Sequence, residues 1–288
     1  MKAIDFYYLT KKHLEDLATL HGVEDLEKYY FLTDFIAYPQ LERMNEIEQT
    51  FMQLTLHGQN ATIISNIVNM KKNYNILREV LCGFNPQEML KKYNIGTREE
   101  NIDVLIQAFR DAGLSWRDDK SSKRPNAIMK RYANMLFDAA TYLEKFTNKQ
   151  EVIGDLLSHF ENGNTKALIT YFRSKITTGY SVALSCDFLK EYAEEFCDLP
   201  KPDIHIKDTL CTLNGLELGY YHTEHSEYQC IEELQKLVRD INLELKNRNE
   251  KEITVYQLDR MIWLICSNKF FLDGNMNNSK SRYLSAII

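Results

Sequence analysis

Apolar residues recur three and four positions apart along most of this 288-residue chain, for example in residues 63–68, 104–109 and 234–241. This spacing places them on one face of a helix. Five prolines and eleven glycines are few for this length, and alternating strand-like runs are scarce. A hydrophobic content of 44% is ordinary for a globular protein and supplies one large core or two small ones. We therefore expect an all-α protein.

The helical patterns form two sets, which predict two helical lobes with a cleft between them. The first set lies in residues 1–149, with patterns at 9–20, 24–37, 40–56, 60–81, 98–112 and 124–146. The second lies in residues 150–272, with patterns at 150–160, 164–173, 180–196, 204–213, 224–247 and 254–268. Residues 273–288 begin with an Asn/Ser-rich stretch and are expected to form a loose C-terminal tail.

Asp203 follows two of the five prolines, Pro200 and Pro202, and precedes the helical pattern at 204–213. Prolines fix their own φ and bias the preceding residues to extended geometry, so Asp203 should be held rigidly at a helix N-terminus. The unsatisfied N–H groups there favour an ionised carboxylate by about 0.3–1 kcal/mol at exposed sites. Capping the helix is the simplest role for Asp203, and a catalytic role is the alternative.

A short polar turn around Gly179 separates two helical patterns upstream of Asp203. Between residues 162 and 186 there is no acidic residue, whereas Lys166, Arg173 and Lys175 give a local charge of +3 in a chain of net charge −6. Backbone N–H groups that open a helix can bind a phosphate without reading any base. This turn is therefore a candidate DNA-backbone contact.

A helix, a glycine turn, a second helix and then an aspartate at a helix start resemble the helix-hairpin-helix DNA glycosylase superfamily. Gly179 and Ala183 keep its spacing from the second hairpin glycine to an alanine, and Asp203, Ile206 and Lys207 match its Asp-x-x-(Ile/Val)-Lys pattern. The resemblance implies that Asp203 is catalytic. It also implies DNA contacts from the hairpin and its surroundings, at Lys175, Thr177, Thr178, Gly179, Ser181 and Lys207.

Two hairpin positions depart from the superfamily pattern. Thr177 stands where the first hairpin glycine is usual, and Ser181 stands where bifunctional members carry a nucleophilic lysine. Without an amine at position 181 no Schiff base can form there, so strand cleavage after base removal is not expected. The resemblance thus implies a monofunctional glycosylase.

A second stretch, residues 51–61, is similar to the constitutive bacterial 3-methyladenine glycosylases, whose corresponding stretch carries Gly-Gln-Gln-Ala. Residues 70–74 and 84–86 extend this match, and together the resemblances span roughly residues 50–270. His57 replaces an acidic base-contacting residue, so the alkylpurine specificity is not carried over. Candidates to line the base pocket or probe the duplex are His57, Gln59, Asn60, Trp116 and Tyr38.

An acidic protein that binds DNA must concentrate its positive charge, because phosphate contacts supply most nonspecific affinity. Residues 120–137 contain five basic residues and no acid, namely Lys120, Lys123, Arg124, Lys130 and Arg131. From this run we expect Lys123 and Arg124 to contact the DNA backbone. A solvated helix face is the alternative interpretation.

Other chemistry is weakly represented in the sequence. The six cysteines form no CxxC pair and do not match the iron–sulfur members of the superfamily, so we expect reduced core thiols. His222 and His225 lack a third metal ligand at suitable spacing. We expect no metal and no other cofactor, apart from a structural monovalent cation that the hairpin could hold. No signal peptide and no apolar run of roughly 18 residues is present, which predicts a cytoplasmic protein without a membrane contact.

The sequence leaves three functions open. The first is a monofunctional DNA glycosylase that flips a damaged or modified base out of double-stranded DNA, most simply as a monomer. The second is a catalytically silent helix-hairpin-helix DNA-binding protein, because fold similarity does not guarantee activity. The third is an all-helical protein-interaction domain in which Asp203 is only a cap.

Overall fold

The computed structural model describes residues 1–23, 26, 44–58, 71–114, 127–160, 163–267 and 279–288. The regular secondary structure of these residues is helical, with no strand among them, which confirms the all-α prediction. The chain divides into two compact units. Unit 1 comprises Met1–Ala37 and Leu189–Ile288, and unit 2 comprises Tyr38–Phe188. In the described part of the chain, no helix is both long enough and apolar enough to cross a membrane.

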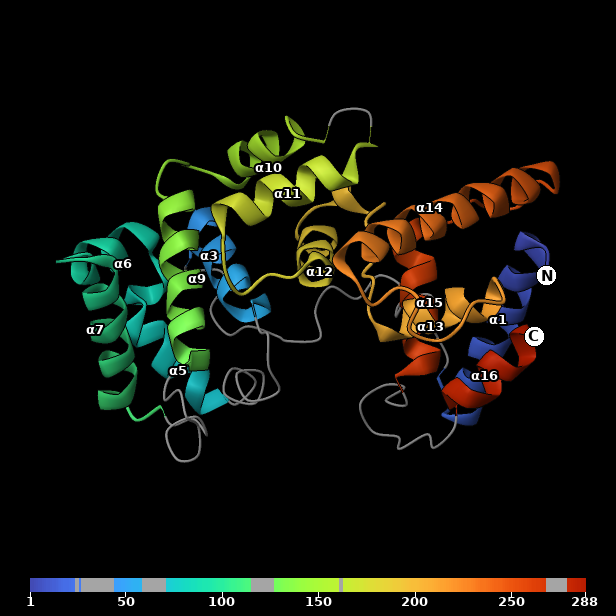
Figure 1. Ribbon diagram of the computed structural model, residues 1–288, viewed down its shortest axis with the longest axis horizontal. Coiled ribbons are helices and arrows are strands. Elements are labelled where there is room, and N and C mark those ends of the chain that lie inside the picture. Colours follow the sequence, from blue (N-terminus) through green and yellow to red (C-terminus); the bar gives the residue numbers. More distant parts are fainter. Residues whose placement is uncertain (24–25, 27–43, 59–70, 115–126, 161–162, 268–278) are drawn as a thin grey trace. The chain divides into compact units, whose positions relative to one another are not determined.

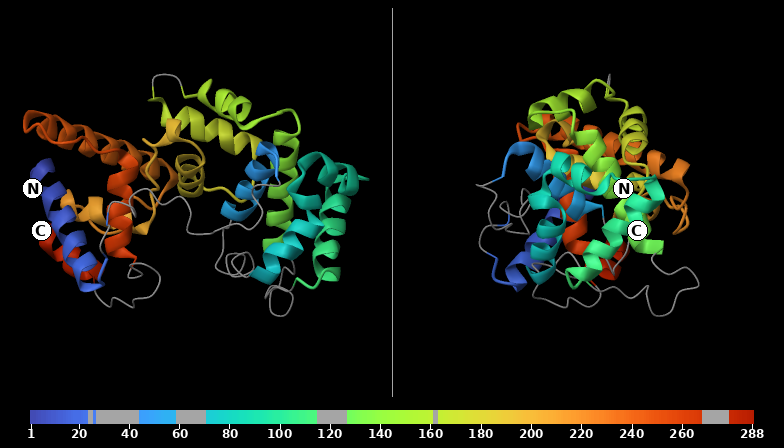
Figure 2. Two further views of the ribbon diagram at one scale, coloured as in Figure 1. Left: turned by 180° about the vertical axis from the view of Figure 1, so that it is seen from behind. Right: turned by 90° about the vertical axis from the view of Figure 1, so that its left-hand side faces the viewer.

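Unit 1 joins the first helix of the chain to the last ones. Its helices are α1 (Ala3–Leu20), α13 (Ile204–Leu213), α14 (Glu224–Asn247), α15 (Val255–Cys266), α16 (Ser279–Ile287) and the short η4 (Glu194–Phe196). Helix α1 contacts α14, α15 and α16, and it lies beside α16 in Figure 1 and in the view from behind in Figure 2. The buried hydroxyls of Thr10 and Tyr283 share a hydrogen bond of 2.8 Å. The two ends of the described chain are therefore part of one core.

Unit 2 is built around α9 (Ala127–Leu143). Its other helices are α3 (Glu46–His57), α5 (Lys71–Val80), η2 (Cys82–Phe84), α6 (Pro86–Tyr93), α7 (Arg98–Asp111), α10 (Lys149–Leu157) and α11 (Thr165–Lys175). Helix α9 contacts α3, α6, α7 and α11, and six of its residues are fully buried: Ala133, Met135, Leu136, Ala139, Ala140 and Leu143. Helix α12 (Val182–Tyr192) begins in unit 2 and ends in unit 1.

The predicted domain borders differ from those of the structure. Residue 150 is not a border, because α10 and α11 belong to unit 2 with the helices before them. Residues 1–37 group instead with unit 1, where the buried side chains of Phe6 and Leu14 join the core formed by α13–α16. The hairpin and Asp203, which the sequence assigns to one lobe, consequently belong to different units.

The C-terminal residues are also corrected. Residues 279–287, predicted as part of a loose tail, form α16. Its Tyr283 and Ile287 are buried in the unit 1 core, and the Ser279 hydroxyl donates to the carbonyl of Ile265 at 2.7 Å. The apolar residues four positions apart supply the burial that makes this helix stable. Helix α6 was likewise missed in the sequence.

Candidate functional site

Asp203 caps α13, as the sequence predicts. Its backbone is extended, with φ −85° and ψ −179°, and its Oδ1 accepts from the N–H of His205 at 2.8 Å and of Ile206 at 3.2 Å. Pro200 and Pro202 are buried on either side of Lys201, whose carbonyl accepts the Asp203 N–H at 2.7 Å. The proline-rich segment therefore fixes both the backbone and one carboxylate oxygen of Asp203.

The two carboxylate oxygens of Asp203 differ in their hydrogen bonding. Among the described residues, Oδ2 has no hydrogen-bond partner and the carboxylate has no ion pair. The residue is half-buried, so the helix N-terminus supports its charge while one oxygen remains available. A carboxylate held in this way can face a developing positive charge or accept a proton.

The hairpin loop, defined as residues 176–181 between α11 and α12, packs closely on α9. Gly179 has φ +85°, a conformation that favours glycine. A Cβ at this position would lie 2.8 Å from Cγ and 2.9 Å from Sδ of Met135. A Cβ on Gly58, at the end of α3, would lie 1.9 Å from the same sulfur. Both glycines of the two family-like stretches thus meet at Met135.

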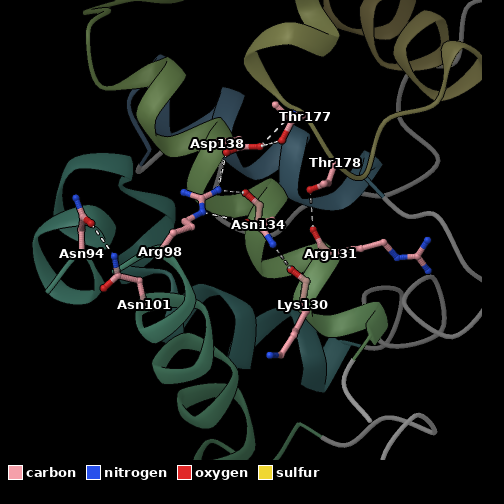
Figure 3. Close-up of polar contacts among 9 residues, drawn as sticks. All are labelled: Asn94, Arg98, Asn101, Lys130, Arg131, Asn134, Asp138, Thr177 and Thr178. Carbon is pink, nitrogen blue, oxygen red and sulfur yellow. Dashed lines mark hydrogen bonds and ion pairs between the residues drawn. The ribbon is translucent and has the colours of Figure 1, made fainter. Parts of the chain in front are cut away.

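Asp138 of α9 anchors the start of the hairpin loop (Figure 3). Its Oδ2 accepts the Thr177 N–H at 3.0 Å and the Thr177 hydroxyl at 2.6 Å. The Thr178 hydroxyl donates to the carbonyl of Arg131 at 3.0 Å. Thr177 therefore contributes a side-chain hydrogen bond that a glycine at this position would lack.

Arg98 of α7 holds Asp138 from the other side. Its guanidinium lies 2.5 Å from Oδ1 of Asp138, and it donates to Oδ1 and the backbone carbonyl of Asn134 at 3.0 and 2.8 Å. The guanidinium carbon also lies 4.9 Å from the centroid of the Phe137 ring. A charge-assisted network thus connects α7, α9 and the hairpin loop. In the sequence, Asp138 is recognisable as the only acidic residue between 120 and 143.

A run of backbone donors follows Thr177. The structure shows no hydrogen-bond partner, among the described residues, for the N–H groups of residues 178–183. Ser181 is exposed, and its hydroxyl accepts the Leu184 N–H at 3.2 Å, so it caps the start of α12. Consecutive unpaired N–H groups at a helix start form an arrangement that suits an anion.

His57, at the end of α3, lies beside the hairpin in an aromatic cluster. Its ring centroid is 5.8 Å from that of Phe188, which in turn contacts Phe172 and Tyr180. The Tyr180 hydroxyl donates to the Leu54 carbonyl at 2.8 Å, and burial raises the pKa of Tyr180 well above its usual value. The hairpin loop and the end of α3, far apart along the chain, are therefore adjacent within unit 2.

The basic residues differ in whether an acidic side chain or an aromatic ring already contacts their charged group. Lys207 is buried, and its Nζ lies 2.6 Å from Oε1 of Glu227. Nζ of Lys175 lies 4.7 Å from the centroid of the Tyr171 ring, and Lys130 pairs with two acids of α7. Arg131 is exposed and has no ion-pair partner in the described part of the chain. In Figure 3 its side chain extends away from Asp138 and Arg98.

Within the described ranges, Arg131 is therefore an exposed cation next to the hairpin loop, to which its carbonyl is hydrogen-bonded. Arg131 belongs to the basic run of the sequence, but the predicted DNA contacts of that run are Lys123 and Arg124. Those two residues, together with Tyr38, Gln59, Asn60 and Trp116, lie outside the described residues. Which cation of a basic run is unpaired depends on acids elsewhere in the chain, so the sequence alone does not single out Arg131.

The described cysteines are all free, and four of them, Cys186, Cys211, Cys230 and Cys266, are buried. This agrees with the expectation of reduced core thiols. Within the described ranges there is no cluster of three histidine, cysteine or acidic side chains that could hold a metal ion.

Comparison of the chain with protein-family models, curated protein sequences and solved structures found no match. The functional interpretation consequently rests on the chain's own residues.

Proposed function

We propose that this chain is a monofunctional DNA glycosylase that hydrolyses the N-glycosidic bond of a damaged or modified base. The observation that carries the proposal is the carboxylate of Asp203, which has one oxygen fixed by two backbone N–H groups and the other uncommitted among the described residues. The hairpin loop and the start of α12, where the N–H groups of residues 178–183 have no partner among the described residues, supply a separate feature suited to a DNA phosphate.

The proposed reaction places two demands on the protein. The base must leave the stack, and the sugar develops oxocarbenium character as the bond from C1′ to the base nitrogen breaks. The bonding electron pair leaves with the base, which takes up a proton, and water adds at C1′. Asp203 stabilises the positive sugar and accepts the proton of the water. Ser181 offers no amine, so the abasic strand remains intact.

DNA binding is assigned to the hairpin loop and to Arg131. The loop is rigid because Thr177, Thr178 and Gly179 are each held against α9. Backbone N–H groups and an exposed guanidinium position a phosphate without reading the base sequence. Lys207 is left out of this contact set, because its ammonium is buried against Glu227.

The test compares the parent with Asp203→Asn on duplexes that carry alkylated, oxidised, deaminated or hypermodified bases. Asparagine is an equally good N-cap, so the variant keeps the fold and removes the charge. Asp198→Asn is the matched control, because Asp198 is exposed and close in sequence. We expect base release from the parent and the control, measured by mass spectrometry, and loss of release with retained DNA binding in Asp203→Asn.

Two results would contradict the proposal. Base release by Asp203→Asn at the parental rate would remove Asp203 from the mechanism. A parent that binds duplex DNA but releases no base from any member of the panel would favour the second candidate, a catalytically silent helix-hairpin-helix DNA-binding protein. That candidate is supported by the hairpin loop alone, whose hydrogen bonds to α9 and α3 lie within unit 2 and do not involve Asp203.

A further inference from the structure

A buried ion pair contacts the backbone of Lys201, two residues before Asp203. Nζ of Lys190, at the end of α12, is 2.7 Å from Oδ2 of Asp259, in the middle of α15. The two side chains are only 4% and 3% exposed. The Tyr256 ring, whose centroid is 5.5 Å from the ammonium, covers the pair. All three residues lie in unit 1, which is also the compact unit that contains Asp203.

This ion pair is connected to Asp203 through one residue. Oδ2 of Asp259 also accepts the N–H of Lys201 at 2.7 Å, and the carbonyl of Lys201 accepts the N–H of Asp203 at 2.7 Å. Pro202, which lies between them, has a fixed φ. The position of the Asp259 carboxylate therefore determines the position of Lys201, and Lys201 determines the backbone of Asp203.

The charge of Lys190 helps Asp259 to act as a hydrogen-bond acceptor for the Lys201 N–H. Burial raises the pKa of Asp259, the Lys190 ammonium lowers it, and the nearby charge of Asp203 raises it again. Lys190 thus favours the ionised carboxylate, which is the stronger acceptor for the Lys201 N–H. Buried ion pairs often contribute no more stability than well-packed apolar residues of similar size. A pair retained at this position is accordingly better explained by the geometry that it imposes.

We propose that Asp259, held by Lys190, is a positioning residue that sets the carboxylate of Asp203 through the backbone of Lys201. The inference rests on the proposed function, because it assumes that Asp203 is the catalytic group. Asp259 is buried and acts without touching the DNA. A misplacement of about 1 Å in a reacting group can lower a rate by about 100-fold.

Two double variants of the full chain separate positioning from folding. Lys190→Met/Asp259→Leu replaces the pair by apolar side chains, which avoids a lone buried charge and removes the acceptor for the Lys201 N–H. Lys190→Gln/Asp259→Asn also removes both charges but keeps a side-chain oxygen that can accept this N–H. The readouts are kcat, KM, the thermal transition, and hydrogen exchange of the Lys201 amide.

We expect the apolar variant to fold, to keep the parental KM, to lose about 100-fold in kcat and to exchange the Lys201 amide faster than the parent. The amide variant should retain kcat within a few-fold and protect the same amide. An apolar variant with parental kcat would overturn the inference while leaving the proposed function intact. A lower thermal transition with unchanged kcat would overturn it too, because it would show a purely structural role. A parent without base release would overturn both proposals.

Discussion

The packing of the hairpin loop against Met135 predicts that Gly179→Ala is much more harmful than an alanine at a glycine of similar backbone geometry. Gly113, also in unit 2, has φ +88°, compared with +85° at Gly179. Among the described residues, no heavy atom lies within 4 Å of a Cβ built on Gly113, whereas three atoms of Met135 lie within 3.0 Å of a Cβ built on Gly179. Both substitutions place an alanine at a positive φ, but only Gly179→Ala also brings its Cβ into collision with Met135.

The magnitudes follow from these two terms. An alanine in the left-handed region costs about 1–2 kcal/mol, which applies to both variants. Displacing the buried Met135 side chain adds about 1–3 kcal/mol for Gly179→Ala alone. We therefore expect losses of about 1–2 kcal/mol for Gly113→Ala and about 2–5 kcal/mol for Gly179→Ala. With roughly 2–4 °C per kcal/mol for a folding unit of this size, Gly179→Ala should lower Tm by at least about 4 °C.

Urea unfolding followed by circular dichroism measures both variants on one scale. A double-mutant cycle with Met135→Ala tests the cause, because that substitution removes the Cγ and Sδ atoms that the new Cβ would meet. The double variant Gly179→Ala/Met135→Ala should lose less than the sum of the two single losses. Equal losses for Gly179→Ala and Gly113→Ala, or strict additivity in the cycle, would refute the close packing of the hairpin loop on α9.

Two further predictions concern charge. Arg131→Gln should weaken binding to duplexes of any sequence and reduce the slope of log K against log salt by about 1. The control Lys130→Gln removes a lysine that is already paired with Glu99 and Asp103, so it should change DNA binding little. Equal effects of the two substitutions would argue against a phosphate contact at Arg131. Burial lowers the pKa of His205 below 6.5, against the opposing effect of the Asp203 charge, so the native state binds fewer protons than the unfolded chain and its stability falls as the pH drops through 6.5. In His205→Gln the urea midpoint should fall less than in the parent between pH 7.5 and pH 5.5, and an identical fall would contradict the assignment.

Local signals predicted several of the helices that begin with a side-chain cap. The bounds of α13 and α14 agree with the predicted 204–213 and 224–247, because Asp203 and Thr223 mark their first turns by hydrogen bonding to backbone N–H groups. Helix α6 was missed although Asn85 and Pro86 are a start signal of the same kind. The apolar pattern of its eight residues is too short to be distinguished from a loop.

Long-range packing could not be predicted in the same way. The partners of α1 are α14–α16, more than 200 residues later in the sequence, and nothing in its own pattern indicates them. The same limitation applies to the site. The sequence marks Gly179 as a turn residue, but the side chain that a Cβ at this position would collide with belongs to Met135, 44 positions earlier. The sequence does not single out Asp259, because a buried carboxylate in a helix interior becomes informative only when its partners, Lys190 and Lys201, are known.

Under the proposed function, the division of the chain assigns DNA binding to one unit and base release to the other. The hairpin loop, Arg131 and the supporting Asp138 belong to unit 2, whereas Asp203 and the Lys190–Asp259 pair belong to unit 1. Because each set is held by contacts within its own unit, substitutions in unit 2 should change DNA affinity and its salt dependence. Substitutions at Asp203 or the pair should change base release at constant affinity. If Asp203→Asn weakened DNA binding as strongly as Arg131→Gln, this assignment of binding to one unit and chemistry to the other would be wrong.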